Sequence, residues 1–259
     1  AFQGPEGRCV GQTMRLVVAG GTGLVGRKVV ALATDRGHDV KVLSRATGVD
    51  LTTGTGLADA LTGADVVIDV SNSASISESG SRSFFDAATP RLLQAEQDAG
   101  VQHHVVLSIV GIDRAPYGYY AGKLTQEEYV LAGPVPFTLQ RATQFHEFAA
   151  QIFASMGWGP LHAAFRMRTQ PVAAAEVAAA LVGRAEADPA GRATDLAGPQ
   201  EEQLSQMVRA YARTRGHRGV VVPVSMPGKL GRAQRDGSLL PGAGVQMGSQ
   251  TFGEWLREL

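Results

Sequence analysis

A glycine-rich turn near the start of the chain restricts the fold more than any other feature of the sequence. Residues 20–26 read GGTGLVG, directly after the apolar, β-branched run 15–19 and directly before a segment with helical spacing. A strand that turns sharply into a helix through glycines presents bare backbone amides and the positive end of the helix dipole at one point. This arrangement predicts that the turn binds the pyrophosphate of a dinucleotide, with an ordinary tight turn as the alternative.

Apolar runs with strand character alternate with helical segments over residues 15–141. Strands are expected at 15–19, 38–43, 48–51, 65–70, 103–108 and 136–141. Helices are expected at 23–36, 56–62, 84–99 and 119–131. The Ser-rich stretch 71–83 has no periodicity and predicts a loop. The alternation is typical of βαβ units, and with right-handed crossovers it predicts an α/β fold with a doubly wound parallel sheet, the Rossmann fold.

The second half of the chain is less regular. Helices are expected at 145–156, 176–184, 201–215 and 252–259, and strands at 161–165, 194–196 and 220–224. No linker or repeat is visible, so residues 14–259 are interpreted as one Rossmann domain with a small C-terminal subregion that covers the substrate. Residues 1–13 lack apolar periodicity and are interpreted as a disordered extension or a tag remnant.

Composition argues against several classes of protein. The 24 basic and 24 acidic residues balance, whereas a nucleic-acid binder usually carries a basic surplus. One cysteine, Cys9, allows no intrachain disulfide, and no HxxxH or HExxH spacing supports a metal site. No apolar run approaches the ~20 residues of a membrane span, and no signal-peptide pattern is visible. We therefore expect a cytoplasmic protein that acts on a small molecule.

The end of the second expected strand predicts which dinucleotide binds. A carboxylate there would bind the ribose 2′-hydroxyl of NAD, but this strand ends in Ser44 and Arg45. Arg45 could pair with a 2′-phosphate, which favours NADP(H), although a solvated surface arginine is the alternative. Asp50 could reach the adenine or only cap a turn. Ser71 and Asn72, past the end of a later strand, could contact the ligand or simply begin a polar loop.

Three residues further along could carry catalysis. Ser108 ends the strand 103–108, and Tyr119 and Lys123 are four residues apart, which places them on one helix face. A nearby ammonium would lower the pKa of a phenol so that it can act as a general acid. A serine hydroxyl would hold the carbonyl oxygen of the substrate. The alternative for Tyr119 is an aromatic residue that only packs.

On these residues the chain resembles the short-chain dehydrogenase/reductase superfamily. The resemblance rests on GGTGLVG at 20–26, Ser108 and YxxxK at 119–123. The run LSIVGID…YGYYAGK, with TQPV at 169–172 before Glu176, is similar to the atypical NmrA-like NAD(P)-binding branch. That branch includes non-catalytic redox sensors, many of which lack the tyrosine that is present here.

The resemblance implies a role for each residue. Tyr119 would be the proton donor, Lys123 would bind the nicotinamide ribose and lower the pKa of Tyr119, and Ser108 would orient the substrate. The candidates for cofactor binding are Gly20, Thr22, Gly23, Leu24, Val25, Gly26, Ser44, Arg45, Asp50, Ser71, Asn72 and Lys123.

An aromatic cluster after the sixth expected strand predicts the character of the substrate. Tyr117 and Phe145 could wall an apolar pocket together with Phe148, Phe153, Met156 and Trp158, although each alone could be a core residue. His146 is either a substrate contact or a packed histidine at a helix start. The aromatic group favours a bulky apolar or aromatic substrate. The alternative is an anionic substrate, for which Arg166 and Arg168 supply positive charge.

These patterns together predict an NADPH-dependent oxidoreductase that reduces a carbonyl or quinone-like group, with Tyr119 as the proton source. Two alternatives share the site: a non-catalytic NADP(H) redox sensor, and an epimerase or dehydratase that retains its cofactor. A homodimer through an apolar helix face is also open.

Overall fold

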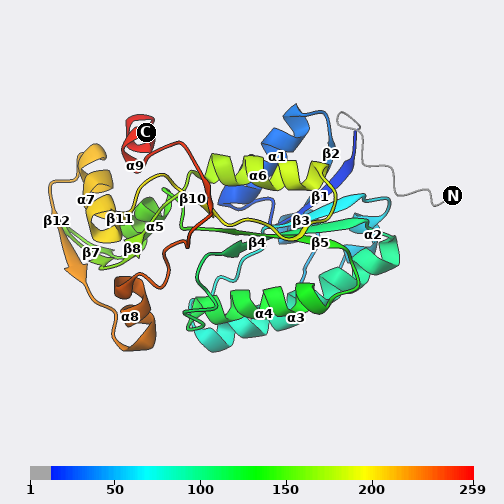
Figure 1. The fold of residues 1–259 in the computed structure, drawn as a ribbon, viewed down its shortest axis with the longest axis horizontal. Helices are drawn as coiled ribbons and strands as arrows, with labels where there is room; N and C mark the ends of the chain where they lie inside the picture. The colour runs from blue at the N-terminus through cyan, green and yellow to red at the C-terminus, as the bar shows by residue number, and fades with distance from the viewer. Residues whose placement is uncertain (1–12) are drawn as a thin grey trace.

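The computed structural model describes residues 13–259, so most of the expected extension 1–13 lies outside the described residues. Its centre is an eight-stranded sheet in the order β13-β10-β5-β4-β3-β1-β2, with β9 paired to β5, and all of these pairs are parallel (Figure 1). The strands are β1 (Arg15–Ala19), β2 (Asp39–Leu43), β3 (Val66–Asp69), β4 (His103–Ile109), β5 (Phe137–Ala142), β9 (Gly191–Arg192), β10 (Leu196–Ala197) and β13 (Gln246–Met247). The predicted α/β class and parallel sheet are confirmed.

Helices cover both faces of this sheet. In Figure 1, α1 (Leu24–Asp35) and α6 (Ala174–Glu186) lie above it, and α3 (Glu78–Ala99) and α4 (Tyr119–Ala132) lie below. Alternate residues of β1 serve the two sides: Leu16 and Val18 join the core under α1 and α6, whereas Val17 joins the core on the other side, with α2 (Leu57–Leu61). Burial on both faces explains why the central strands β1 and β3 are nearly continuous apolar runs, whereas the edge strand β2 alternates between polar and apolar residues.

Two elements differ from the sequence prediction. The expected strand 48–51 does not join the sheet, because this stretch folds back on itself through a single antiparallel bridge between Asp50 and Thr55. Gly48 and Gly54 both have positive φ, and the Asp50 carboxylate accepts hydrogen bonds from Thr52, so a turn replaces the strand. The sheet therefore ends at β2, beside the short 3₁₀ helix η1 (Arg45–Thr47).

The Ser-rich stretch is only partly a loop. Helix α3 begins at Glu78, not at residue 84, because the Ser77 hydroxyl caps it by accepting a hydrogen bond from the Gly80 amide at 3.2 Å. Serine is among the preferred N-cap residues, so part of the serine run starts the helix.

A C-terminal subregion lies beside the sheet with its own apolar core, which includes Met167, Leu204, Met207 and Trp255. Its helices are α5 (Phe148–Ser155), α7 (Leu204–Thr214), α8 (Gly228–Asp236) and α9 (Phe252–Arg257). Its strands are β6 (Gly157–Trp158), β7 (Leu161–Phe165), β8 (Arg168–Thr169), β11 (Glu202–Gln203) and β12 (Val220–Val224). The helix α8 is an element that the sequence did not predict.

The three-stranded sheet β12-β7-β6 presents apolar side chains to solvent. Val220, Leu161 and Trp158 are neighbours across the three strands, and Trp158 is 90% exposed. The Val220 amide donates to the Pro160 carbonyl at 2.8 Å, so the backbone of Val220 is hydrogen-bonded on the β7 side. The backbone groups of the alternate residues, Val221 and Pro223, therefore point away from β7, toward the outer edge of β12. The outward carbonyl of Val221 accepts a hydrogen bond from a side chain of α7 at 3.2 Å.

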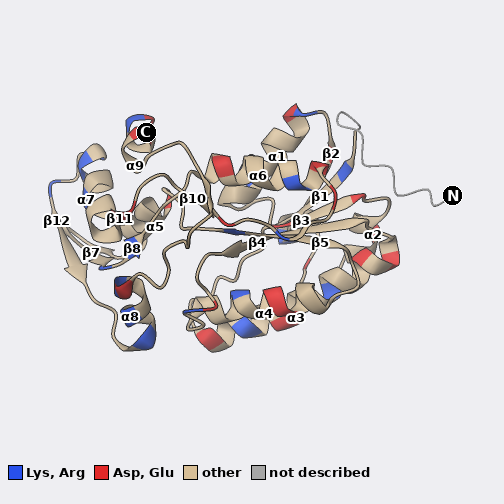
Figure 2. Ribbon diagram, viewed as in Figure 1, with Lys and Arg blue, Asp and Glu red and all other residues tan. Residues whose placement is uncertain are grey.

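Charges of both signs are mixed over α3 and α4 (Figure 2). Within residues 13–259, each helix is too short or too polar to cross a lipid bilayer.

Candidate functional site

The glycine-rich turn is closed so tightly that two of its positions exclude a side chain. Gly20 has a φ of +80°, and a Cβ there would lie 2.7 Å from the Val70 carbonyl oxygen. A Cβ on Gly26 would collide with the carbonyl oxygen of Gly20, which itself accepts a hydrogen bond from the Gly23 amide at 2.9 Å. The turn therefore has the shape that lets a ligand approach bare backbone.

Helix α1 starts inside this turn, with Gly23 as an N-cap that has no side chain. The amides of Leu24, Val25 and Gly26 belong to the first helical turn, whose N–H groups have no partner within the helix. The Leu24 and Val25 side chains pack into the core, so these residues offer only backbone to a ligand, while Thr22 is exposed. This cradle fits the pyrophosphate of a dinucleotide, because the free amides and the helix dipole favour an anion.

The end of β2 holds three further candidates. The Ser44 hydroxyl caps η1, where it accepts a hydrogen bond from the Thr47 amide at 3.3 Å. Arg45 is exposed, and its charge contributes weakly to the lowered pKa of the Asp50 carboxyl. The main cause of that lowering is the hydrogen bonding of Thr52 to Asp50, at 2.6 Å from the hydroxyl and 2.8 Å from the amide. These bonds favour the turn-capping alternative for Asp50.

Ser71 and Asn72 connect the turn to the catalytic candidates. The strand order reverses between β1 and β3, which is where parallel α/β sheets bind ligands. The Ser71 backbone, just past the end of β3, lies within 2.9 Å of where a Gly20 Cβ would be. The neighbouring Asn72 accepts a hydrogen bond from the Tyr119 hydroxyl at 2.5 Å. Two consecutive residues thus contact both the glycine-rich turn and the tyrosine.

Tyr119 is the first residue of α4, and its pKa differs from the sequence expectation. Burial raises this pKa above its ordinary value, and the neighbouring Tyr120 adds a smaller increase. The expected lowering by Lys123 is wrong for this structure, because the Lys123 ammonium is bound elsewhere. Burial also raises the pKa of the neighbouring Tyr120, to about 12, and the Tyr120 side chain packs against the apolar core of the C-terminal subregion.

The ammonium of Lys123 is held by buried polar groups on the strand side of α4. It donates to the Leu107 carbonyl at 2.7 Å and to the Gln126 side-chain oxygen, and it lies 5.1 Å from the centre of the Phe85 ring. Burial lowers the pKa of Lys123 to about 8, and the negative charges of Asp69 and Glu127 offset part of this effect.

Gln126 and Asp69 are functional candidates that the sequence did not reveal. The Gln126 amide donates to one Asp69 carboxylate oxygen at 2.7 Å, and the other oxygen accepts from the Ser71 amide at 2.8 Å. A buried chain of hydrogen bonds therefore links Lys123 to the segment beside the glycine-rich turn. The only sequence signal is that Gln126 follows Lys123 by three residues, on the same helix face.

Ser108 offers a free hydroxyl. The residue is 1% exposed, and its Oγ has no hydrogen-bond partner within residues 13–259. It directly follows Leu107, whose carbonyl binds Lys123. An unpaired buried hydroxyl costs free energy, so this oxygen is suited to bind an oxygen atom of a ligand.

The residues expected to contact the substrate are more scattered. Tyr117 packs against the C-terminal core, with the Lys229 ammonium 5.8 Å from its ring centre, and Phe145 packs against the main core. His146 is fully buried, and its Nε2 donates to the Gln250 carbonyl at 3.0 Å, which favours the packed alternative. Trp158 is exposed, so an aromatic wall that includes it is wrong.

Comparison with known proteins supports the fold. Residues 16–140 match the model of the NAD dependent epimerase/dehydratase family, and this segment contains the turn, Ser108, Tyr119 and Lys123. No curated protein sequence matches the chain.

Solved structures match over nearly the whole chain. MoeE5 in complex with UDP-glucuronic acid and NAD has a TM-score of 0.73 at 17% identity, covering 94% of this chain and 96% of that one. A UDP-galactose 4-epimerase gives 0.70 at 17%, covering 95% and 97%. A short-chain dehydrogenase/reductase superfamily protein from Agrobacterium tumefaciens with bound NAD gives 0.65 at 20%, covering 94% and 95%. The chain has the Rossmann-like α/β fold of these proteins, and the NmrA-like branch stays a prediction.

Proposed function

We propose that the protein is an NADP(H)-dependent oxidoreductase that reduces a carbonyl or quinone-like group of a small molecule. The observation that carries the proposal is the pair Ser71 and Asn72, which contacts the Gly20 turn on one side and the Tyr119 hydroxyl on the other. The match of residues 16–140 to a family described as NAD dependent supports a nicotinamide dinucleotide at that turn. The dinucleotide, when bound, supplies the hydride.

The chain's own residues then bind and protonate the substrate. The Tyr119 phenol is protonated at neutral pH and can donate its proton to an oxygen that gains negative charge, but its raised pKa makes it a weaker acid than the sequence leads us to expect. The free Ser108 hydroxyl can donate a hydrogen bond to the same oxygen. Lys123, Gln126 and the Asp69 carboxylate form a buried chain of hydrogen bonds, which Lys123 joins to the Leu107 carbonyl next to Ser108.

Substituting Tyr119 tests this mechanism. In a screen of NADPH oxidation across ketones, quinones and enones, Tyr119→Phe should lower kcat on an identified substrate by about 10²- to 10⁴-fold. Tyr129→Phe is the matched control, because this hydroxyl lies on the same helix but donates to Asp86 on the exposed surface at 3.2 Å. Undiminished turnover by Tyr119→Phe would contradict the mechanism, and binding of NADPH without any turnover would favour the sensor alternative.

The preference for NADP(H) rests on Arg45, which is exposed at the end of β2 where no carboxylate replaces it. Arg45→Gln removes a charged hydrogen-bond donor, typically worth about 1.5–3 kcal/mol, so NADPH affinity should fall at least about tenfold. NADH affinity should stay unchanged. Calorimetry measures both, with Arg36→Gln at the far end of α1 as the control. An equal effect on the two cofactors would contradict the preference.

An epimerase or dehydratase that retains its dinucleotide is the second candidate, and the family match over residues 16–140 favours it. Such a protein would release NAD or NADP on denaturation after purification, and chromatography of the supernatant would detect it. A protein that purifies free of dinucleotide and turns over NADPH would support the reductase instead. Dimerisation stays a prediction.

A further inference from the structure

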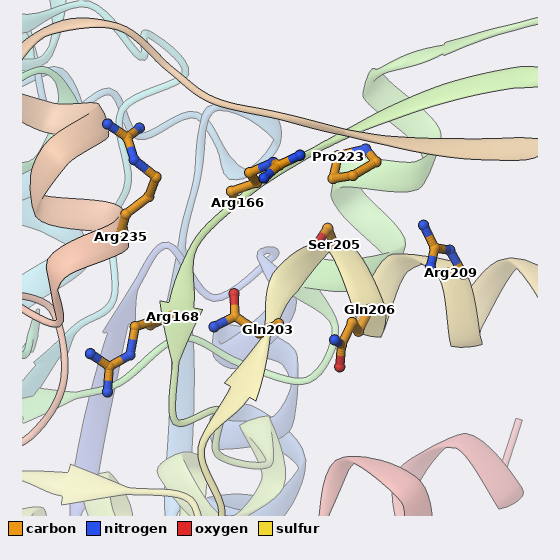
Figure 3. Close-up of a pocket in the computed structure, with 8 residues that line it drawn as sticks. All are labelled: Arg166, Arg168, Gln203, Ser205, Gln206, Arg209, Pro223 and Arg235. Atoms are coloured by element: carbon orange, nitrogen blue, oxygen red, sulfur yellow. The ribbon is translucent and has the colours of Figure 1, made fainter.

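A pocket rich in arginine lies in the C-terminal subregion, apart from the glycine-rich turn. It encloses about 430 Å³, within the usual range for small-molecule sites. Figure 3 shows the residues that line it, which are Arg166, Arg168, Gln203, Ser205, Gln206, Arg209, Pro223 and Arg235. None of these lining residues is acidic.

The positive charge of this pocket is largely unbalanced. Arg168 forms a two-pronged ion pair with Glu201, at 2.7 and 3.0 Å. Arg209 and Arg235 donate only to backbone carbonyls, at 3.2 and 3.0 Å, and Arg166 forms no ion pair within residues 13–259. Gathering like charges costs folding free energy, and such local conflicts are typical of functional sites.

The start of α7 adds to the positive potential. Ser205 and Gln206 lie in the first turn of this eleven-residue helix and line the pocket. The N-cap Gln203 makes no side-chain capping bond, so it satisfies none of the free amides of that turn. Helix amides, a dipole and arginine forks together match the oxygens of a phosphate group.

Helix α8 joins this pocket to the candidate active site. Near its start, the Leu230 side chain lies 3.2 Å from where a Cβ of Gly118 would be, and Gly118 directly precedes Tyr119. Arg235, five residues on, lines the pocket. At 1.5 Å per residue the two positions are about 7.5 Å apart along the helix axis, so one short helix contacts both the start of α4 and the pocket. Figure 2 shows basic residues on both α8 and β8.

We propose that this pocket binds a phosphate or diphosphate ester group of the substrate, whose carbonyl is reduced at Tyr119. The first part stands on the pocket alone, and the second rests on the proposed function. The substrate is then a phosphorylated small molecule, not the purely apolar one that the aromatic residues in the sequence favour. The three arginines without carboxylate partners, Arg166, Arg209 and Arg235, match the charge of a multiply charged oxyanion.

Calorimetry with inorganic pyrophosphate as the probe tests the pocket. The titration is run on the full chain with and without saturating NADPH, so that binding at the glycine-rich turn is blocked in one arm. Arg166→Gln and Arg209→Gln should each weaken pyrophosphate at least fivefold in both arms. Arg213→Gln is the matched control, because Arg213 is exposed one turn beyond Arg209 on α7 and does not line the pocket. Citrate should bind more weakly than pyrophosphate.

The possible results distinguish a failure of the pocket from a failure of the proposed oxidoreductase function. Equal pyrophosphate affinity in the pocket variants and the control, or loss of all pyrophosphate binding in the arm with NADPH, overturns the pocket. Tighter binding of citrate overturns the phosphate chemistry. Pyrophosphate binding that depends on Arg166, in a protein that binds no dinucleotide, keeps the pocket and overturns the proposed function. With a reducible phosphorylated compound, Arg166→Gln should raise KM at least fivefold at unchanged kcat, and an unchanged KM overturns the link to the substrate.

Discussion

The buried ammonium of Lys123 should make the stability of the protein depend on pH in a way that one substitution removes. The side chain is 4% exposed, and burial lowers its pKa from 10.5 to about 8. Each pKa unit corresponds to 1.36 kcal/mol, so holding the charged form in the fold costs about 3 kcal/mol at pH 7 relative to the neutral amine.

The sign follows from proton binding. Between about pH 8 and 10.5 the unfolded chain keeps a proton that folded Lys123 has released, so raising the pH stabilises the fold. From pH 7 to pH 9.5 the free energy of unfolding of the native protein should gain about 2 kcal/mol relative to Lys123→Met, which has no group to titrate. Titration of the tyrosines and carboxyls is shared by both proteins and cancels in the difference.

Urea unfolding at several pH values between 7 and 9.5, extrapolated linearly to water, measures this difference. Lys41→Met is the control, because Lys41 is exposed, and its difference from the native protein should not change with pH. Parallel stability curves for the native protein and Lys123→Met would refute the reasoning, since they would mean that Lys123 keeps its ordinary pKa in the fold.

Two further predictions concern the turn and the C-terminal segment. Gly26→Ala should weaken dinucleotide binding in calorimetry at least tenfold and lower stability by about 1–3 kcal/mol, because its Cβ collides with a turn carbonyl. Gly183→Ala, inside α6 with open space around the new Cβ, should instead gain up to about 1 kcal/mol, and equal losses would contradict the steric argument. Burial lowers the pKa of His146, so the free energy of unfolding should fall as the pH drops below about 6.5. In urea unfolding between about pH 5 and 7, His146→Phe should show a weaker dependence of this free energy on pH than the native protein.

The sheet could be predicted from sequence because its signals are local. Continuous β-branched runs such as 65–70 have no other stable place than a strand that is buried on both faces. The stretch 48–51 has only Val49 and Leu51 as apolar residues, and the positive φ of Gly48 and the hydrogen bonds to Asp50 favour a turn. Helix α8 escaped prediction because two of its residues are glycines, and Gly231 lies so close to the Met226 backbone that no side chain fits.

The site was predictable only as far as spacing along the chain determines it. The spacing of four residues from Tyr119 to Lys123 sets a common helix face. The ammonium is nevertheless bound by Gln126, which in turn binds Asp69, and that second contact depends on another strand. The arginine pocket is assembled from β7–β8, β11–α7, β12 and α8, and nothing in a single sequence joins such distant segments.

The outer edge of β12 bears on aggregation. A strand edge with free amides and carbonyls can recruit a strand from another molecule, and the apolar side chains beside this one would strengthen such a contact. Here Pro223 has no amide to donate, and the Val221 carbonyl already accepts a hydrogen bond from Arg209. Both features oppose the addition of another strand at this edge. Arg209 and Pro223, the two residues that block this edge, also line the arginine pocket. A substitution that changes ligand binding at these positions would therefore also change the tendency of the protein to aggregate. Exchanging Pro223 for a strand-forming residue with a free amide would open the β12 edge to pairing with a strand of another molecule, beside the exposed Val220 and Val222.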